Sequence, residues 1–248
     1  MGKVIEFIAN TKEMLEVIEK PYPAITKLPD WISNTPSYIN GKKSVDDFGD
    51  PNSTIKKCLP VVDAMTAGYH IPLHCDVWVE NAGPSDINIK WSWDTLQVID
   101  MQKQEQMQTY PVPEGFYPTS FKFINPWIVK TPAGWSCLFT HPLHHDDLPY
   151  KCLPAIVDTD KHPIPVNFLF FLNKNFSGLI EKGTPMIQVI PFKREDFKSQ
   201  FSFDTGSFKQ KWEKAHQVFF DRYKKFFRSP KKYEQGDLKK CPFAFLHK

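Results

Sequence analysis

The sequence has little glycine, and its cysteines show no motif. It contains 11 glycines against 22 prolines. So many prolines disfavour long helices in the body of the protein and favour short strands joined by fixed turns. The five cysteines are widely spaced and form no C-x-x-C pair. We therefore expect reduced thiols in a cytoplasmic setting and no zinc ribbon.

Long apolar runs are also missing. The longest, VNFLFF at 166–171, is far too short to span a bilayer. The opening stretch, MGKVIEFIANTKEM, lacks the continuous apolar segment of a signal peptide. We expect no contact with a membrane.

What the chain does contain is typical of a folded globular protein. Its 248 residues are 41% hydrophobic and 24% charged, with 21 phenylalanines, so it can bury a proper core. The net charge of +3 is uneven, because residues 208–240 carry eleven Lys or Arg and four Asp or Glu. A solvated helix face is the first interpretation of this basic tail, and a surface that binds nucleic acid is the alternative.

The pattern along the chain predicts three parts. Residues 1–57 form an arm that packs on the core, with one short helix in TKEMLEVIEK that Thr11 caps. Residues 58–195 form a β-rich core domain. Residues 196–248 form a helical basic tail.

Short alternating segments between Cys58 and Phe192 predict the strands. HCDVWVE and INIKWSW alternate with period 2 and form a candidate hairpin, with Val77 and Val79 on one face. SFKFINPWIVKTP, GWSCLFTHP, VNFLFFLN and PMIQVIPF follow, each bounded by Pro, Gly or Asn. The fold class is therefore mainly β, a β-clip-like or β-sandwich core with an extended N-terminal arm and a C-terminal amphipathic helix.

That helix is predicted over 208–228, because aromatic residues recur there at steps of three, four or seven with lysines between them. Ser207 is its expected cap, and Pro230 follows its end. It carries more apolar residues than one helix stripe needs. Some of them should cover a second subunit or the body of the same chain.

Four motifs occur in a suggestive order: TAGYHI (66–71), TPAGWSCL (131–138), AIVDTD (155–160) and LNKNFSGLIEKGTPMIQVIPF (172–192). Together they resemble the β-clip architecture of dUTPases and dCTP deaminases over residues 60–193. The resemblance implies that Asp158 corresponds to the catalytic, water-activating aspartate. It implies that His70, Ser136, Asp160 and Gln188 occupy ligand-binding positions.

The same comparison shows departures from the family pattern. His70 replaces an acidic residue, and Lys161 stands where the family has the tyrosine that packs on sugar and base. Pro163 lies near a glycine position and removes a backbone donor. Phe170 occupies the position of the deaminase glutamate and cannot act as an acid or base. Retained hydrolysis of a dUTP- or dCTP-type nucleotide by Asp158 is therefore the alternative function, not the first expectation.

The chain also resembles a group of proteins encoded by tailed phages and bacteria, through FKFINPWIVKTPAGWSCLFTHP and IVDTD…PVNF…GTPMIQVIPFKRE. This resemblance carries no activity with it. It favours a structural or auxiliary role in the host cytoplasm or in association with the virion. The expected partners are further copies of the chain or other phage or host proteins.

A histidine-rich pattern offers a third function. His74 and Asp76 in HIPLHCD, with a later histidine such as His145 in HPLHHDD, match the facial ligand set of iron/2-oxoglutarate oxygenases. Arg194 would then bind the co-substrate. Adventitious zinc or nickel bound by the loop and an exposed loop without metal are the alternatives.

On balance the sequence predicts a non-catalytic or catalytically degenerate dUTPase-like β protein that acts in assembly or binding. No cofactor is expected.

Overall fold

The computed structural model describes residues 3–83, 86–93 and 96–229. They form two compact units, which are considered separately. The β unit comprises residues up to 24 and residues 67–194. The helical unit comprises residues 25–66 and the described residues from 195 onward. These boundaries differ from the predicted ones, because the arm is divided between the units and residues 58–66 lie outside the β unit.

The structure is mainly β, as predicted, and sandwich-like. Its strands are β1 (Glu6–Ala9), β2 (Tyr22–Pro23), β3 (Tyr69–Pro72), β4 (Val77–Gly83), β5 (Asp86–Trp91), β6 (Ile99–Met101), β7 (Phe116–Phe123), β8 (Trp127–Lys130), β9 (Trp135–Thr140), β10 (Tyr150–Cys152), β11 (Ala155–Val157), β12 (Phe168–Asn173), β13 (Gly178–Ile180) and β14 (Pro185–Lys193).

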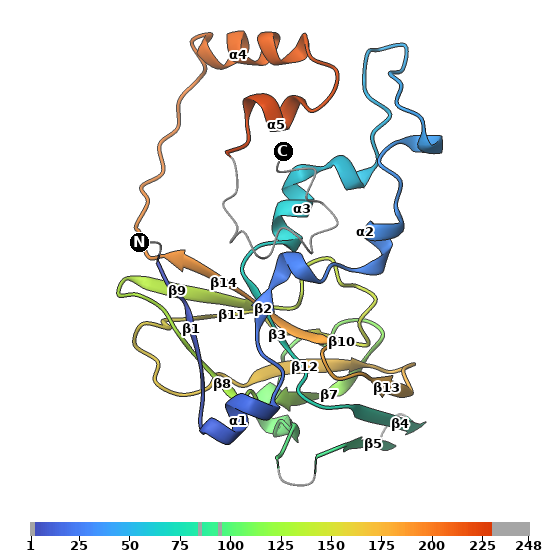
Figure 1. Ribbon diagram of the computed structural model, residues 1–248, viewed down its shortest axis with the longest axis vertical. Coiled ribbons are helices and arrows are strands. Elements are labelled where there is room, and N and C mark those ends of the chain that lie inside the picture. Colours follow the sequence, from blue (N-terminus) through green and yellow to red (C-terminus); the bar gives the residue numbers. More distant parts are fainter. Residues whose placement is uncertain (1–2, 84–85, 94–95, 230–248) are drawn as a thin grey trace. The chain divides into compact units, whose positions relative to one another are not determined.

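The strands of the described chain form four antiparallel sheets (Figure 1). The largest has the order β11-β9-β14-β3-β2, and the next has the order β10-β12-β7-β6. β13-β4-β5 and β1-β8 complete the set. Strand β14 lies between β9 and β3, so its side chains can meet groups from both neighbours.

The core of the β unit lies between the two larger sheets. Phe139 of β9 stacks on Phe168 of β12, with ring centroids 5.5 Å apart. Phe170 of β12 stacks on Phe123 at 3.9 Å and is almost fully buried. Aromatic pairs of this kind add packing energy beyond the area that they bury.

The predicted β4–β5 hairpin is confirmed. Val77 and Val79 are buried, while Trp78 and Glu80 between them are exposed, as period-2 alternation requires. Val79 is paired with Ile89.

The N-terminal arm is more regular than predicted. Its helix α1 (Lys12–Val17) is confirmed, and Thr11 Oγ1 accepts from Met14 N at 3.1 Å. However, Glu6–Ala9 forms β1 and pairs with β8. An edge strand of four residues gives little local signal, since its partner lies more than a hundred residues away.

The helices complete the inventory: α2 (Asp30–Asn34), α3 (Leu59–Met65), α4 (Ser207–His216) and α5 (Arg222–Phe226), with 3₁₀ turns η1 (Ala24–Thr26), η2 (Ile39–Gly41), η3 (Ile55–Lys57) and η4 (Gln104–Met107). Ile25, Ile32, Val62 and Met65 are among the buried residues of the helical unit. None of the helices in the described part of the chain is long and apolar enough to cross a membrane.

The predicted 208–228 helix is interrupted. It divides into α4, which ends at His216, and α5, which begins at Arg222. Asp221, just before α5, adopts a left-handed conformation with φ of 57°, which a right-handed helix cannot include. Ser207 is the first residue of α4 and not its cap. Asp204 does the capping, since its carboxylate accepts from Phe208 N at 3.2 Å and Lys209 N at 3.0 Å. Pro230 lies outside the described residues.

Candidate functional site

The predicted catalytic residue, Asp158, lies just after β11 at one end of the largest sheet. β11 pairs with β9, so Asp158 comes close to Ser136. Ser136 Oγ donates to Asp158 Oδ1 at 2.7 Å, and Arg194 Nη1 lies 3.2 Å from the same oxygen. The side chain of Asp158 is 52% exposed, so solvent reaches it.

Asp160 is bound more tightly than Asp158. Arg194 pairs with both of its carboxylate oxygens, and Gly134 N donates to Oδ2 at 2.8 Å. The side chain of Asp160 is only 6% exposed. The hydrogen bond from Arg194 holds the pKa of Asp160 well below its usual range, and the bond from Gly134 acts in the same direction.

Ser136, Asp158, Asp160 and Arg194 therefore form one group, which we name the Arg194 cluster. Arg194 also donates to Trp135 O at 2.9 Å and to Ser136 Oγ at 3.0 Å. The cluster joins the start of β9, the turn after β11 and the end of β14. Such charge-assisted, bidentate contacts fix a loop in place.

The backbone of Asp158 is also part of this turn. Its carbonyl accepts from Lys161 N at 2.9 Å and His162 N at 3.0 Å. Buried Thr159 shares a hydrogen bond with Thr131 at 2.7 Å. The turn is thus held by hydrogen bonds of both its side chains and its main chain.

His70 and Gln188, two of the predicted ligand-binding residues, lie elsewhere and are fully buried. They face each other across the β3–β14 pairing. Gln188 Oε1 accepts from Leu143 N at 2.8 Å, and its Nε2 donates to Ala67 O at 2.7 Å. The side-chain amide of Gln188 thus connects β14 to the loop after β9 and to the residues just before β3.

The ring of His70 contacts two other rings of the interior. It meets Tyr22 at 5.6 Å and His145 at 5.5 Å between centroids, both edge to face. His70 and Gln188 are separated from the Arg194 cluster along β14. The six residue steps from Gln188 to Arg194 span about 20 Å. The predicted catalytic and ligand-binding residues thus form two groups, one at the end of the sheet and one inside it.

The predicted metal ligands are not brought together as a set. His74 packs against Trp93 at 5.5 Å, and Asp76 Oδ1 accepts from Lys182 N at 2.7 Å. His145 lies against His70 instead. Within residues 3–83, 86–93 and 96–229, no three His, Cys, Asp or Glu side chains are arranged to hold a metal ion. Burial, and secondarily the charge of Lys182, lowers the pKa of His74 to about 4.

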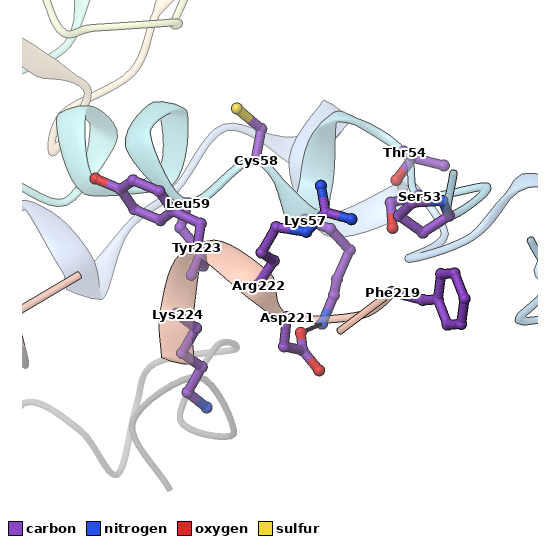
Figure 2. Close-up of a pocket in the computed structure, with 11 residues that line it drawn as sticks. Ser53, Thr54, Lys57, Cys58, Leu59, Phe219, Asp221, Arg222, Tyr223 and Lys224 are labelled. Atoms are coloured by element: carbon purple, nitrogen blue, oxygen red, sulfur yellow. Dashed lines mark ion pairs between the residues drawn. The ribbon is translucent and has the colours of Figure 1, made fainter. Parts of the chain in front are cut away.

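The helical unit contains a cavity that the sequence analysis did not identify (Figure 2). Its volume is about 310 Å³, and it lies among residues 51–59 and 219–224. Lys57 and Asp221 point toward each other there and form an ion pair at 3.0 Å. Its advance signal in the sequence was the group of basic residues in DRYKK, part of the basic tail that was predicted to form a solvated helix face or to bind nucleic acid.

A second hollow in the helical unit, about 830 Å³ in volume, is the aromatic groove of α4 and α5. It is lined by Phe208, Lys209, Lys211, Trp212, Lys214, Phe226 and Phe227. Trp212 and Phe227 stack with centroids 6.5 Å apart. The predicted amphipathic segment therefore does present aromatic and basic side chains together.

The segment before α4, residues 195–206, has no helix or strand. Its three phenylalanines are nearly fully exposed: Phe197 at 89%, Phe201 at 95% and Phe203 at 86%. We call this segment the aromatic arm. Side chains of this kind are costly to leave in water.

Comparison with known proteins adds no assignment: no family model matches the chain, and no curated protein matches it.

Proposed function

We propose that the protein is a non-catalytic, dUTPase-like β protein that acts by assembling with further copies of itself. The observation that carries the proposal is the aromatic arm, with three phenylalanines exposed on a segment without regular structure. Several large apolar side chains exposed on one segment are typical of a surface that another chain covers.

The aromatic groove is the complementary surface. Residues 195–206 contain three acidic residues and one basic residue, whereas 207–229 contain seven basic and two acidic residues. An acidic aromatic segment and a basic aromatic groove attract each other in both charge and apolar character. Because the arm's own phenylalanines are exposed, they do not fill the groove of the same chain. The arm of a second copy is the occupant that fits.

The Arg194 cluster supports the non-catalytic part of the proposal. One oxygen of Asp158 is shared by Ser136 and Arg194, so the carboxylate is occupied in holding a turn. His70 and Gln188 are buried at a distance from it. A hydrolase needs its base and all of its ligand-binding groups around one substrate. Ser136 and Asp160 lie beside Asp158, but His70 and Gln188 do not join them. We also propose that the protein acts among phage or host proteins. One of those proteins, in place of a second copy of this chain, is the alternative partner for the aromatic groove.

Light scattering of the full chain after size-exclusion chromatography tests assembly. We expect a mass above that of one chain, with Phe203→Ser weakening association by about tenfold or more, since each buried Phe contributes about 1.5–3 kcal/mol. Phe48→Ser is the matched control, because Phe48 is as exposed as the arm residues but lies outside the arm and the groove. A wild-type chain that stays monomeric at every concentration would refute the proposal.

A pyrophosphate-release assay with dUTP and dCTP tests the non-catalytic part. We expect no turnover by the wild-type protein. Turnover that disappears in Asp158→Asn would establish the hydrolase alternative instead. Because Asn keeps the size of the side chain, loss of activity in that variant would be chemical in origin.

A further inference from the structure

We propose that the cavity among residues 51–59 and 219–224 is a binding site for a small organic phosphate with an aromatic or other compact apolar body. The site lies within the helical unit, and its residues belong neither to the aromatic arm nor to the lining of the aromatic groove. The inference therefore does not depend on the proposed assembly.

Size is the first argument. At about 310 Å³ the cavity is at the lower end of the range of pockets for small molecules. Its walls come from two segments that are far apart in the sequence, η3 with the turn before it and the start of α5. A cavity formed by long-range packing has a defined shape, unlike a groove along one helix.

Charge is the second argument. Three cationic residues line the cavity, Lys57, Arg222 and Lys224, against one carboxylate, Asp221. The lining is therefore net positive, which favours a phosphate monoester, a group that carries about −1.5 to −2 near neutral pH. Inside a concave, partly buried site these charges act at a lower effective dielectric constant than in bulk water.

The surroundings of Asp221 reveal this positive field. Burial by itself would raise the pKa of Asp221, yet the hydrogen bond and charge of Lys57, with the charges of Lys43 and Lys224, lower it. Asp221 begins α5, but its side chain does not cap the helix as an aspartate there usually would. Its carboxylate pairs with Lys57 instead and so competes with an anionic ligand for that amine.

The directions of the side chains indicate which groups would contact the phosphate. Figure 2 shows Arg222 extending toward the segment that carries Ser53, Thr54 and Lys57, whereas Lys224 points away. Arg222 uses its Nε to donate to Val218 O at 3.1 Å. Its two terminal nitrogens are the part of the guanidinium that can bind a phosphate bidentately.

The apolar part of the ligand would contact the apolar residues of the lining. Pro51, Leu59 and Phe219 line the cavity together with the polar groups. Phe219 lies directly against Gly49, where an added Cβ would be 3.0 Å from the ring. This close approach holds the ring at the cavity's edge, where it can stack on an aromatic ligand.

Isothermal titration calorimetry of the full chain with phenyl phosphate tests the proposal. We expect phenyl phosphate to bind more tightly than inorganic phosphate, benzyl alcohol or benzoate, since only the first combines a phosphate with an aromatic ring. Arg222→Gln should weaken binding by about tenfold, the effect of losing a charged hydrogen bond. Lys42→Gln is the control, because it removes one positive charge from the same unit outside the cavity lining.

Asp221→Asn separates a binding effect from damage to the fold. Removing the competing carboxylate should tighten phenyl phosphate binding by about threefold or more, and a misfolded variant could not bind more tightly. Undetectable binding of phenyl phosphate would overturn the proposal. It would also be overturned by equal losses in Arg222→Gln and Lys42→Gln, by weaker binding in Asp221→Asn, or by a preference for benzoate.

Discussion

Aromatic side chains have opposite environments in the two units. In the β unit Phe139, Phe168 and Phe170 are buried and stack on one another or on neighbouring rings. In the helical unit Phe208 and Phe226 are exposed. The same residue type therefore stabilises one unit from within and lies on the surface of the other, where the proposed assembly would bury it. A count of phenylalanines cannot distinguish these roles, whereas their spacing and their neighbours can.

Truncation of one ring in each unit should show the largest difference. Phe170→Ala removes a ring that stacks on Phe123 and also contacts Phe121 and Tyr150. We expect it to lower the free energy of unfolding by about 3–5 kcal/mol. Phe226→Ala removes a half-exposed ring and should cost less than about 1 kcal/mol.

Urea unfolding of the two variants measures both values. Equal losses would contradict the comparison, because they would mean that the exposed ring is as well packed as the buried one. A loss in Phe226→Ala that depends on protein concentration would instead indicate that assembly buries this ring.

The buried strands could be predicted from the sequence because their signal is local. The alternation of apolar and polar residues predicted the β4–β5 hairpin, with Val77 and Val79 buried. The capping residue Thr11 predicted the start of α1. The β1–β8 pairing could not be predicted, since it joins short segments far apart in the chain. The break between His216 and Arg222 was missed as well. The aromatic residues keep their helical spacing across it, so the sequence pattern does not reveal the left-handed conformation of Asp221.

The candidate site was predictable to a similar degree. The motif order brought together Ser136, Asp158 and Asp160, which the structure does place in one group. The sequence did not predict that Arg194 belongs to that group, because its place there depends on β14 pairing with β9. Burial of His70 and Gln188 was missed too, because strand order decides which residues are central. The Lys57–Asp221 cavity joins segments more than 150 residues apart and has no motif at all.

A buried histidine in the β unit should make its stability depend on pH. The pKa of His74 is lowered to about 4 by burial and by Lys182, whereas an unfolded histidine titrates near 6.5. Between these pH values the unfolded chain takes up a proton that the folded chain does not. The free energy of unfolding should therefore fall as pH decreases from about 6.5 to 4, by up to about 3 kcal/mol.

Urea unfolding at a series of pH values measures this slope. His74→Leu removes one titrating group and should reduce the slope over that interval; His141, whose pKa burial also lowers, accounts for the remainder. His216→Gln, at an exposed position in the helical unit, should leave it unchanged. If the wild type and His74→Leu showed the same slope, His74 would have the same pKa in the folded and unfolded states, which would contradict the prediction.

The smallest of these effects is expected at the Arg194 cluster, where solvent reaches part of the group. Asp160 has a lowered pKa in the folded protein, so its contribution to stability is complete above the unfolded pKa near 3.9 and is lost as pH falls further. Arg194→Gln removes the partner that lowers this pKa. The variant should be less stable than the wild type at neutral pH, and the difference should shrink below about pH 4 as the carboxylates become protonated.

Hydrogen exchange shows whether the cluster acts locally, as its contacts imply. In Arg194→Gln the amides of Gly134 and of the turn after β11 should exchange faster, while those of α3 should not change. Arg228→Gln is the counterpart in the helical unit, because Arg228 pairs with Asp63 of α3 through two hydrogen bonds. It should accelerate exchange in α3 and α5 and leave the turn after β11 unchanged. If either substitution accelerated exchange equally in both units, the two units would unfold as one cooperative structure. The aromatic residues of the interior and those of the surface would then stabilise the same fold.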